Sequence, residues 1–126
     1  MDECQEKLAA VIGAPVSVLY RLKINHINPE IIIQHVLRTC NVRHSQLVSQ
    51  SREKELVVAR YLIIWLVTYY CGISSEKVAA MVNRDRTTVP HAIAEINDKL
   101  DVNDEMYVKP LKEIERLLLN NINDAA

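Results

Sequence analysis

Apolar residues recur along this chain with helical spacing, and no segment shows the strict alternation of a half-buried strand. The segment Asn28-Pro29-Glu30 predicts a helix start, because it joins an Asn N-cap, a Pro at the first position and an acid in the first turn. This helix is expected to reach about Cys40, with Asn41 as the left-handed residue that ends it. Further short helices are predicted at residues 2–12, 16–23 and 45–50.

The longest predicted helix spans residues 52–71, with Ser51 as a candidate N-cap and Gly72 as its end. Residues 56–70 are apolar apart from Arg60 and Thr68, and a helix that is apolar on nearly all sides is buried on nearly all sides. We therefore expect it to be the central helix of the domain. Its aromatic residues are interpreted as core rather than as a surface for stacking bases: Tyr61, Trp65, Tyr69 and Tyr70.

Three more helices are predicted towards the C-terminus. One runs from Ser74 or Ser75 to about residue 82, one from about 86 to 100, and one from Asn103 to about 120. Pro110 is expected to kink the last helix or to mark a later start for it. The predicted fold class is all-α, a compact multi-helix domain over residues 28–126 with an N-terminal helical appendage at residues 1–27.

Residues 75–93 have the spacing of a helix-turn-helix. This motif needs a small residue where its two helices touch, a turn residue that tolerates positive φ four positions later, and an apolar residue six positions after that. Ala79, Asn83 and Val89 meet these requirements, and Asn is second only to Gly in tolerating a left-handed turn. Many helical hairpins would also satisfy the spacing.

The turn and the start of the second helix carry short or bidentate hydrogen-bonding groups. An Arg pairs with guanine O6 and N7, an Asp accepts from cytosine N4, and a Thr methyl packs on a thymine methyl. A recognition helix presents its N-terminal residues to the major groove, which makes these side chains candidate base readers. Asp85 or one of the Thr residues is alternatively a helix cap, and the Arg residues are alternatively solvated charges. The cluster comprises Arg84, Asp85, Arg86, Thr87 and Thr88, with His91 one turn later facing phosphate or water.

Charge is distributed unevenly, although the 126-residue chain has a formal net charge of only −1. Residues 38–91 carry eight basic and four acidic side chains, whereas residues 92–126 carry four basic and eight acidic ones. The middle of the chain is therefore positive by four charges and the last part negative by four. Attraction to phosphate depends on the local face rather than on the total, so nucleic acid remains a possible partner.

Other classes of function find little support in the composition. The three cysteines lie far apart with no CxxC pair, and no His lies at metal-ligand spacing from them, so we expect no metal site and no cofactor. No signal peptide or membrane-spanning run is visible, and we expect reduced thiols and a cytoplasmic, nucleoid-associated location. Only two glycines occur, which leaves no Gly-rich loop for a nucleotide. The absence of paired carboxylates or a nucleophile–base pair argues against an enzyme.

The block Arg84-Asp85-Arg86-Thr87-Thr88-Val89-Pro90-His91-Ala92-Ile93 resembles the signature "RDHTTV-HA-" of the C-terminal DNA-binding domain of the bacterial replication initiator DnaA. The resemblance runs from about residue 31 to residue 119. It implies a six-helix, Trp-repressor-like fold that binds a short, asymmetric, AT-rich box of double-stranded DNA. No ATPase domain is visible in the sequence, so the resemblance implies a stand-alone DNA-binding module rather than an initiator.

The resemblance also implies roles for individual residues. Arg60 matches the Arg that enters the minor groove, where A·T runs deepen the negative potential. Asp85 and Thr87 match residues that read bases, while Thr88 and His91 match residues that contact the backbone or bases. The positions matching the family's phosphate-contacting basic loop are Ser51, Arg52 and Lys54.

Three departures from the family pattern alter the expected readout. Arg86 replaces the motif's His, which favours guanine over a thymine contact. The Gly-Gly turn is shortened by one residue to Asn83. Pro90 costs about 3 kcal/mol inside a helix that starts at Asp85, but little if Thr87 is the N-cap. We therefore expect the recognition helix to begin later than in the family, or to bend.

The leading hypothesis is sequence-specific binding of duplex DNA in replication or its regulation, as a monomer or as a homodimer formed through residues 1–27. The alternative is a helical protein-interaction module or a regulator that kept the scaffold with altered or lost DNA specificity. A positive patch joining Arg52, Arg60, Arg84 and Arg86 would argue against that alternative.

Overall fold

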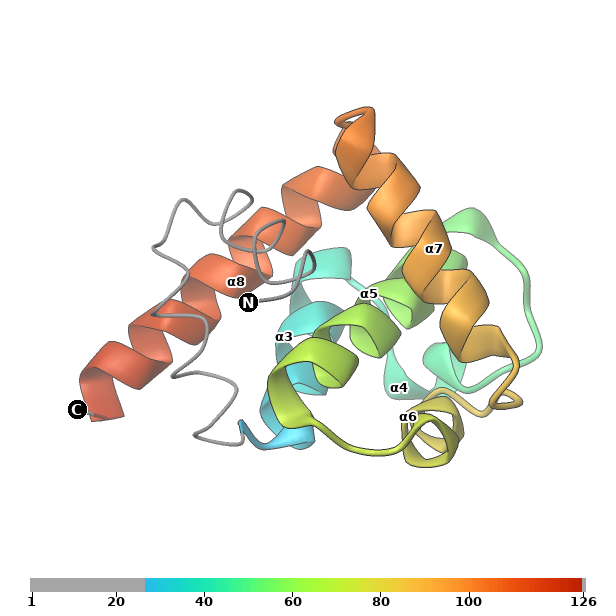
Figure 1. Cartoon of the computed structure of the whole chain (residues 1–126), viewed down its shortest axis with the longest axis horizontal. Helices are drawn as coiled ribbons and strands as arrows, with labels where there is room; N and C mark the ends of the chain where they lie inside the picture. Colours follow the sequence, from blue (N-terminus) through green and yellow to red (C-terminus); the bar gives the residue numbers. More distant parts are fainter. Residues whose placement is uncertain (1–26, 126) are drawn as a thin grey trace.

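The computed structural model describes residues 27–125, and in this part of the chain it contains six α-helices and no strand (Figure 1). The all-α fold class is confirmed. The helices predicted at residues 2–12 and 16–23 lie outside the described residues, as does all of the proposed appendage before Ile27. The helices are α3 (Pro29–Cys40), α4 (His44–Leu47), α5 (Lys54–Cys71), α6 (Ser75–Met81), α7 (Thr88–Asp101) and α8 (Glu105–Ala125).

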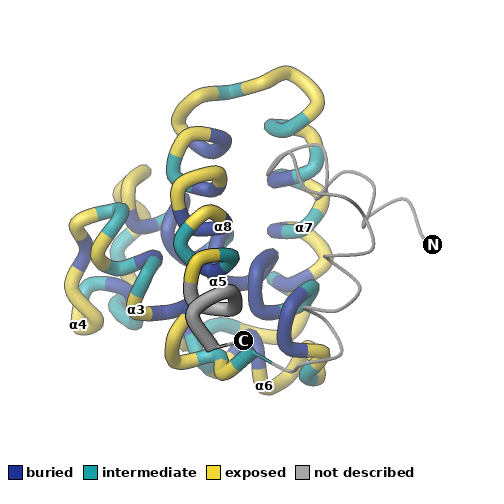
Figure 2. The backbone as a smooth tube through the Cα atoms, turned by 90° about the vertical axis from the view of Figure 1, so that its left-hand side faces the viewer, coloured by how far each residue is buried: buried dark blue, intermediate teal, exposed yellow. Residues whose placement is uncertain are grey.

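The helix α5 is the central element, as the apolar run predicted. Twelve of its eighteen residues are buried, and it contacts all five other helices, most extensively α3 and α7 (Figure 2). Gly72 ends it in the left-handed conformation at φ 64°. Its start differs from the prediction, because α5 begins at Lys54 and Ser51 is not its cap. The Ser51 hydroxyl instead accepts a hydrogen bond of 3.3 Å from the Glu53 N–H, before the helix begins.

The helix α3 begins and ends as predicted. The Asn28 side chain accepts from the Glu30 N–H at 2.9 Å, Pro29 is the first helical residue, and Asn41 ends the helix at φ 56°. Its buried face packs on α5 and α8. The helix predicted at residues 45–50 is shorter than expected, and its C-terminal half is a loop that leads into α5.

The aromatic residues of α5 divide into two pairs. Trp65 and Tyr70 are buried in the core, as predicted, and Trp65 donates from Nε1 to Asn97 Oδ1 at 3.2 Å. Tyr61 and Tyr69 are only half-buried. Tyr69 packs edge-on against Trp65, with the ring centroids 4.8 Å apart. Tyr61 lies at the surface described in the next section, so its assignment to the core is only partly right.

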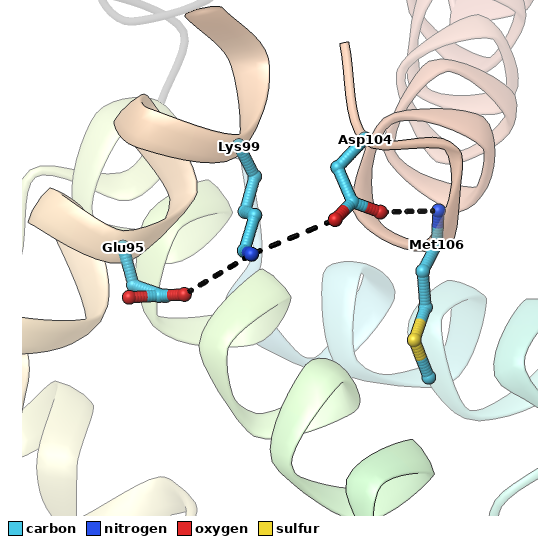
Figure 3. A network of polar contacts seen from close by, with 4 residues as sticks. All are labelled: Glu95, Lys99, Asp104 and Met106. Atoms are coloured by element: carbon cyan, nitrogen blue, oxygen red, sulfur yellow. Dashed lines mark hydrogen bonds and ion pairs between the residues drawn. The ribbon is translucent and has the colours of Figure 1, made fainter. Parts of the chain in front are cut away.

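The corner between α7 and α8 is fixed by a small polar network (Figure 3). The Lys99 ammonium lies 3.7 Å from Glu95 and 3.5 Å from Asp104, and the other Asp104 oxygen accepts from the Met106 N–H at 3.0 Å. A carboxylate at this position suits the positive end of the α8 dipole. Because α8 starts at Glu105, Pro110 lies inside it and does not mark its start.

Candidate nucleic-acid interface

The helix-turn-helix predicted from residue spacing is present. Ala79 and Val89 are 1% and 2% exposed where α6 and α7 meet, and Asn83 adopts the left-handed conformation at φ 56°. The Arg84 N–H closes the turn by donating to the Ala79 carbonyl at 2.9 Å. Since a left-handed residue reverses the chain at low cost only for Gly or Asn, the single Asn83 performs the turn that the family makes with two glycines.

The second helix of the motif, α7, starts two residues later than the span of 86–100 predicted for it. Its N-cap position is Thr87, without a side-chain cap, and a tight turn precedes it in which the Thr88 N–H donates to the Asp85 carbonyl at 2.9 Å. Pro90 is thus the third helical residue. The first N–H groups of a helix have no intrahelical partner, so a proline there removes no helical hydrogen bond. The alternative in which Thr87 occupies the N-cap position and Pro90 the third helical position is confirmed.

This placement predicts that Pro90→Ala changes the free energy of unfolding by less than about 1 kcal/mol. The matched control is Ala94→Pro, four residues further along the exposed side of the same helix, where a helical hydrogen bond is lost and the expected cost is about 3 kcal/mol. Urea titration followed by circular dichroism measures both. A loss of 3 kcal/mol in Pro90→Ala would contradict the assigned helix start.

A polar cleft of about 610 Å³ separates the start of α7 from the loop between α4 and α5, with α5 as its floor. It brings together six of the ten residues predicted as DNA-binding, from three segments of the sequence. It also includes Gln50, Val57 and Tyr61, which the sequence interpretation did not select. The six predicted residues are Arg52, Arg60, Arg84, Thr87, Thr88 and His91.

The remaining four predicted residues do not line the cleft. Asp85 and Arg86 are exposed on the turn just before α7, and Lys54 is exposed at the first position of α5. Ser51 is half-buried, with its hydroxyl bound to the loop backbone. The exposed side chains that precede α7 therefore adjoin the cleft without forming its wall.

Tyr61 forms part of the cleft and makes an aromatic contact with α7. Its ring meets the ring of His91 edge-on, with the centroids 6.1 Å apart. Tyr61 was grouped with the core because it lies in the apolar run of α5. It lies four residues after Val57, which also lines the cleft, and residues at this spacing share one face of a helix.

Arg60 is buried, being only 3% exposed, and its guanidinium is directed at the backbone of the α4–α5 loop. Four carbonyl oxygens accept hydrogen bonds from it: Gln46 at 3.1 Å, Leu47 at 2.7 Å, Ser49 at 3.0 Å and Ser51 at 2.6 Å. Burial and the nearby positive charge of Arg84 lower the pKa of Arg60. The predicted insertion of Arg60 into the minor groove stays a prediction, and the described conformation gives the side chain a different set of partners.

Arg84 and Asn83 bind the same loop from the turn of the helix-turn-helix. Arg84 Nη2 donates to the Ser49 carbonyl at 2.9 Å, and Asn83 Nδ2 donates to the Val48 carbonyl at 2.9 Å. Arg84 Nη1 donates in addition to the carbonyl of Asn83 at 2.9 Å. The loop is therefore joined by side chains to both α5 and the motif's turn.

The two cysteine thiols in the described part of the chain are protonated at neutral pH. Burial raises the pKa of both Cys40 and Cys71 to about 11, so neither is a thiolate at neutral pH. Cys71 also lies within 2.9 Å of the Ile27 carbonyl, to which its thiol donates. Within residues 27–125 no group of three His, Cys, Asp or Glu residues is arranged to hold a metal ion, and every helix is too short or too polar to span a bilayer.

An all-helical domain with this motif, opening on a cleft lined by arginines, belongs to the class of helix-turn-helix DNA-binding proteins. Within that class the chain belongs to the family described as bacterial DnaA protein helix-turn-helix, whose model matches residues 29–96. The matched segment runs from the start of α3 into α7 and includes every predicted DNA-binding residue.

Full-length relatives carry the name chromosomal replication initiator protein DnaA. The protein of Nautilia profundicola is 35% identical over 81 residues, covering 64% of this chain and 19% of the relative. That of Bacteroides thetaiotaomicron is 31% identical over 88 residues, covering 69% and 18%. That of Campylobacter concisus is 31% identical over 102 residues, covering 80% and 23%. The chain thus spans about a fifth of the length of these relatives.

Proposed function

We propose that this chain binds double-stranded DNA in a sequence-specific manner, with the start of α7 in the major groove. The observation that supports the proposal is the cleft, which places Arg52 and Arg84 beside the exposed residues at the start of α7. A helical protein-interaction module has no need to gather these charges on one side. Cationic side chains beside an exposed helix start suit a phosphate backbone, because attraction to phosphate depends on the local face rather than on the net charge.

The exposed residues before α7 are the proposed readers of base edges. Asp85, Arg86 and Thr87 are exposed and carry the acceptor, bidentate donor and methyl groups that distinguish base pairs in the major groove. Thr88 and His91 follow on the wall of the cleft, where a DNA backbone would pass.

The loop and the first turn of α5 form the other side of the proposed interface. Arg52 and Lys54 are exposed and supply charge to phosphates, with Ser51 between the loop and the helix. We leave Arg60 out of the groove-reading set, because entry into the minor groove would require its guanidinium to release four carbonyl oxygens.

The wider context follows from the family. We propose that residues 28–126 form the DNA-binding domain, that the target is a short AT-rich site, and that the chain acts in replication or its regulation at the nucleoid. Association into a homodimer would involve residues 1–27. No role for a nucleotide is proposed, since the described residues provide no phosphate-binding loop for one.

Selection of bound sequences from a random duplex pool, followed by affinity measurements at two salt concentrations, tests the proposal. We expect an enriched sequence and an affinity that falls as salt rises, because neutralised phosphates release counterions. Binding without any preferred sequence would remove the claim of specificity. Complete lack of binding at low salt would remove the claim of DNA binding.

Two variants test the orientation of α7. Arg86→Ala and Thr87→Ala are each expected to weaken binding to the selected duplex by roughly 1–3 kcal/mol and to relax preference at one position. Lys112→Ala, an exposed cation on α8, is the matched control and should leave affinity unchanged. Fluorescence anisotropy with labelled duplex measures all three. Full affinity in both α7 variants would show that another face meets the DNA.

A further inference from the structure

We propose that Arg60 is a positioning residue, which holds the α4–α5 loop against the helix-turn-helix and does not itself contact DNA. The role of Arg60 in DNA binding rests on the proposed function. The contacts between Arg60 and the loop are those of the protein without DNA. The loop is residues 48–53, between α4 and α5, and Arg60 holds its first part, residues 48–51, together with the last two residues of α4.

The first argument is the number of donors that Arg60 uses. A guanidinium has five N–H groups and no acceptor, and here four carbonyl oxygens of residues 46–51 lie within 3.1 Å of its three nitrogens. A buried charge needs such partners, since burying a charge without them strongly destabilises the folded state. To contact DNA, the guanidinium would have to break these four hydrogen bonds and form the same number with the DNA.

The second argument concerns the end of α4. The last carbonyls of a helix lack intrahelical partners, and a cation near the C-terminus satisfies them. Leu47 is the last residue of α4, and Arg60 Nε donates to its carbonyl at 2.7 Å. The Gln46 carbonyl, one residue earlier, accepts from Arg60 in addition to the Ser49 N–H and hydroxyl. The guanidinium therefore completes α4 and, through Ser49 and Ser51, fixes the path of the chain that follows.

The third argument is a second attachment from the motif itself. The Ser49 carbonyl accepts from both Arg60 at 3.0 Å and Arg84 at 2.9 Å, and the Val48 carbonyl accepts from Asn83. One peptide of the loop is thus shared by an arginine of the central helix and an arginine of the turn. The distance between the loop and the recognition helix is set by this shared contact.

The consequence is an orientation of the loop backbone that suits an anion. In a planar trans peptide, the C=O and the next N–H point in opposite directions. Because the Ser49 and Ser51 carbonyls point at Arg60, the N–H groups of Gln50 and Arg52 point away from it. Neither N–H has a hydrogen-bond partner in the described part of the chain, and both residues line the cleft. Outward N–H groups beside an exposed Arg52 suit a DNA phosphate.

Hydrogen exchange of the DNA-free full chain tests directly whether Arg60 holds the α4–α5 loop. We expect Arg60→Met to speed exchange of the structured loop amides, those of Val48, Ser49 and Ser51, by about ten-fold or more, because charge-assisted hydrogen bonds are lost. The Ala92 and Ile96 amides of α7 serve as the internal control and should keep their protection. Unchanged loop exchange in a folded Arg60→Met protein would overturn the proposal.

If that variant does not fold, Arg84→Met is the second test, because it removes the other attachment of the loop. We expect it to speed exchange of the same amides, and unchanged exchange would equally overturn the proposal.

Binding to the selected duplex separates positioning from direct contact. Arg60→Lys keeps the charge but cannot fork across four carbonyls, so we expect it to lose affinity nearly as much as Arg60→Met, by about ten-fold or more. The loss should also be smaller in an Arg52→Ala background, because two residues acting through one loop are not additive. Rescue by Lys, or additive losses, would instead show direct contact. If the unaltered protein binds no duplex, the proposed function fails. The hydrogen-exchange result alone then decides whether Arg60 holds the loop.

Discussion

Trp65→Ala is expected to lower the free energy of unfolding by about 3–5 kcal/mol, the largest single effect that the structure predicts. Trp65 is fully buried on α5, so its removal leaves a cavity in the centre of the domain. It also ends the edge-on contact with Tyr69 and the hydrogen bond to Asn97 on α7. Domains of this size are stable by only about 5–15 kcal/mol, so the melting temperature should fall by more than about 10 °C.

Circular dichroism follows this change, since the variant lacks the chain's one tryptophan. Trp65→Phe is the matched control: it keeps a ring but loses the N–H that reaches Asn97, and should cost clearly less than Trp65→Ala. Equal losses in the two variants would mean that the hydrogen bond to α7, not the packing, determines the effect. A loss below about 1 kcal/mol in Trp65→Ala would contradict the central place of α5.

The sequence predicts well those features that depend on neighbouring residues. The start and end of α3 follow from Asn28, Pro29 and Asn41, because capping is a local interaction. The helix-turn-helix follows from the spacing of Ala79 and Val89 around a residue that tolerates positive φ. The late start of α7 could be anticipated because a proline is tolerated only in the first turn of a helix.

Features that depend on distant segments are harder to predict. Arg60 was assigned to DNA by resemblance, yet its partners lie nine to fourteen residues earlier in a loop whose path only the tertiary structure defines. The same contacts account for the late start of α5, since the chain up to Ser51 is held to Arg60 as a loop. A charged residue within an apolar run indicates that its side chain has a specific partner. The sequence does not show which groups accept its hydrogen bonds.

Glu115 is an acidic residue whose spacing from apolar residues of α8 indicates a buried position. It contributes to the acidic charge of residues 92–126, yet its side chain is fully buried. It lies one turn after Leu111 and one turn before Leu118, next to Ile114, and residues at this spacing share one face of a helix. The face of α8 that packs on the core therefore includes a carboxyl group.

Burial of this carboxyl predicts that the protein loses stability as the pH rises. Burial raises the pKa of Glu115 well above its ordinary 4.5, while the hydrogen bond that Tyr70 donates to Oε2 at 3.2 Å lowers it by less. No described residue donates to the other oxygen, Oε1. The unfolded chain therefore releases this proton at a lower pH than the folded one. Its stabilising contribution is complete below the unfolded pKa and is lost as the pH rises through the folded pKa, by up to about 1.4 kcal/mol per pH unit.

Glu115→Gln isolates this effect, because the amide has nearly the same shape and does not titrate. Relative to the unaltered protein, its free energy of unfolding should rise steadily as the pH increases above about 4.5, and the difference should become constant once the folded carboxyl is ionised. Urea titrations at a series of pH values measure the difference, with Glu113→Gln, an exposed neighbour paired with Arg116, as the control for the loss of one surface charge. Because the pKa of Glu113 is lowered by Arg116, that control should show a difference of the opposite sign. A pH-independent difference for Glu115→Gln would mean that the carboxyl is hydrated in solution, and that α8 does not pack on Tyr70 as described.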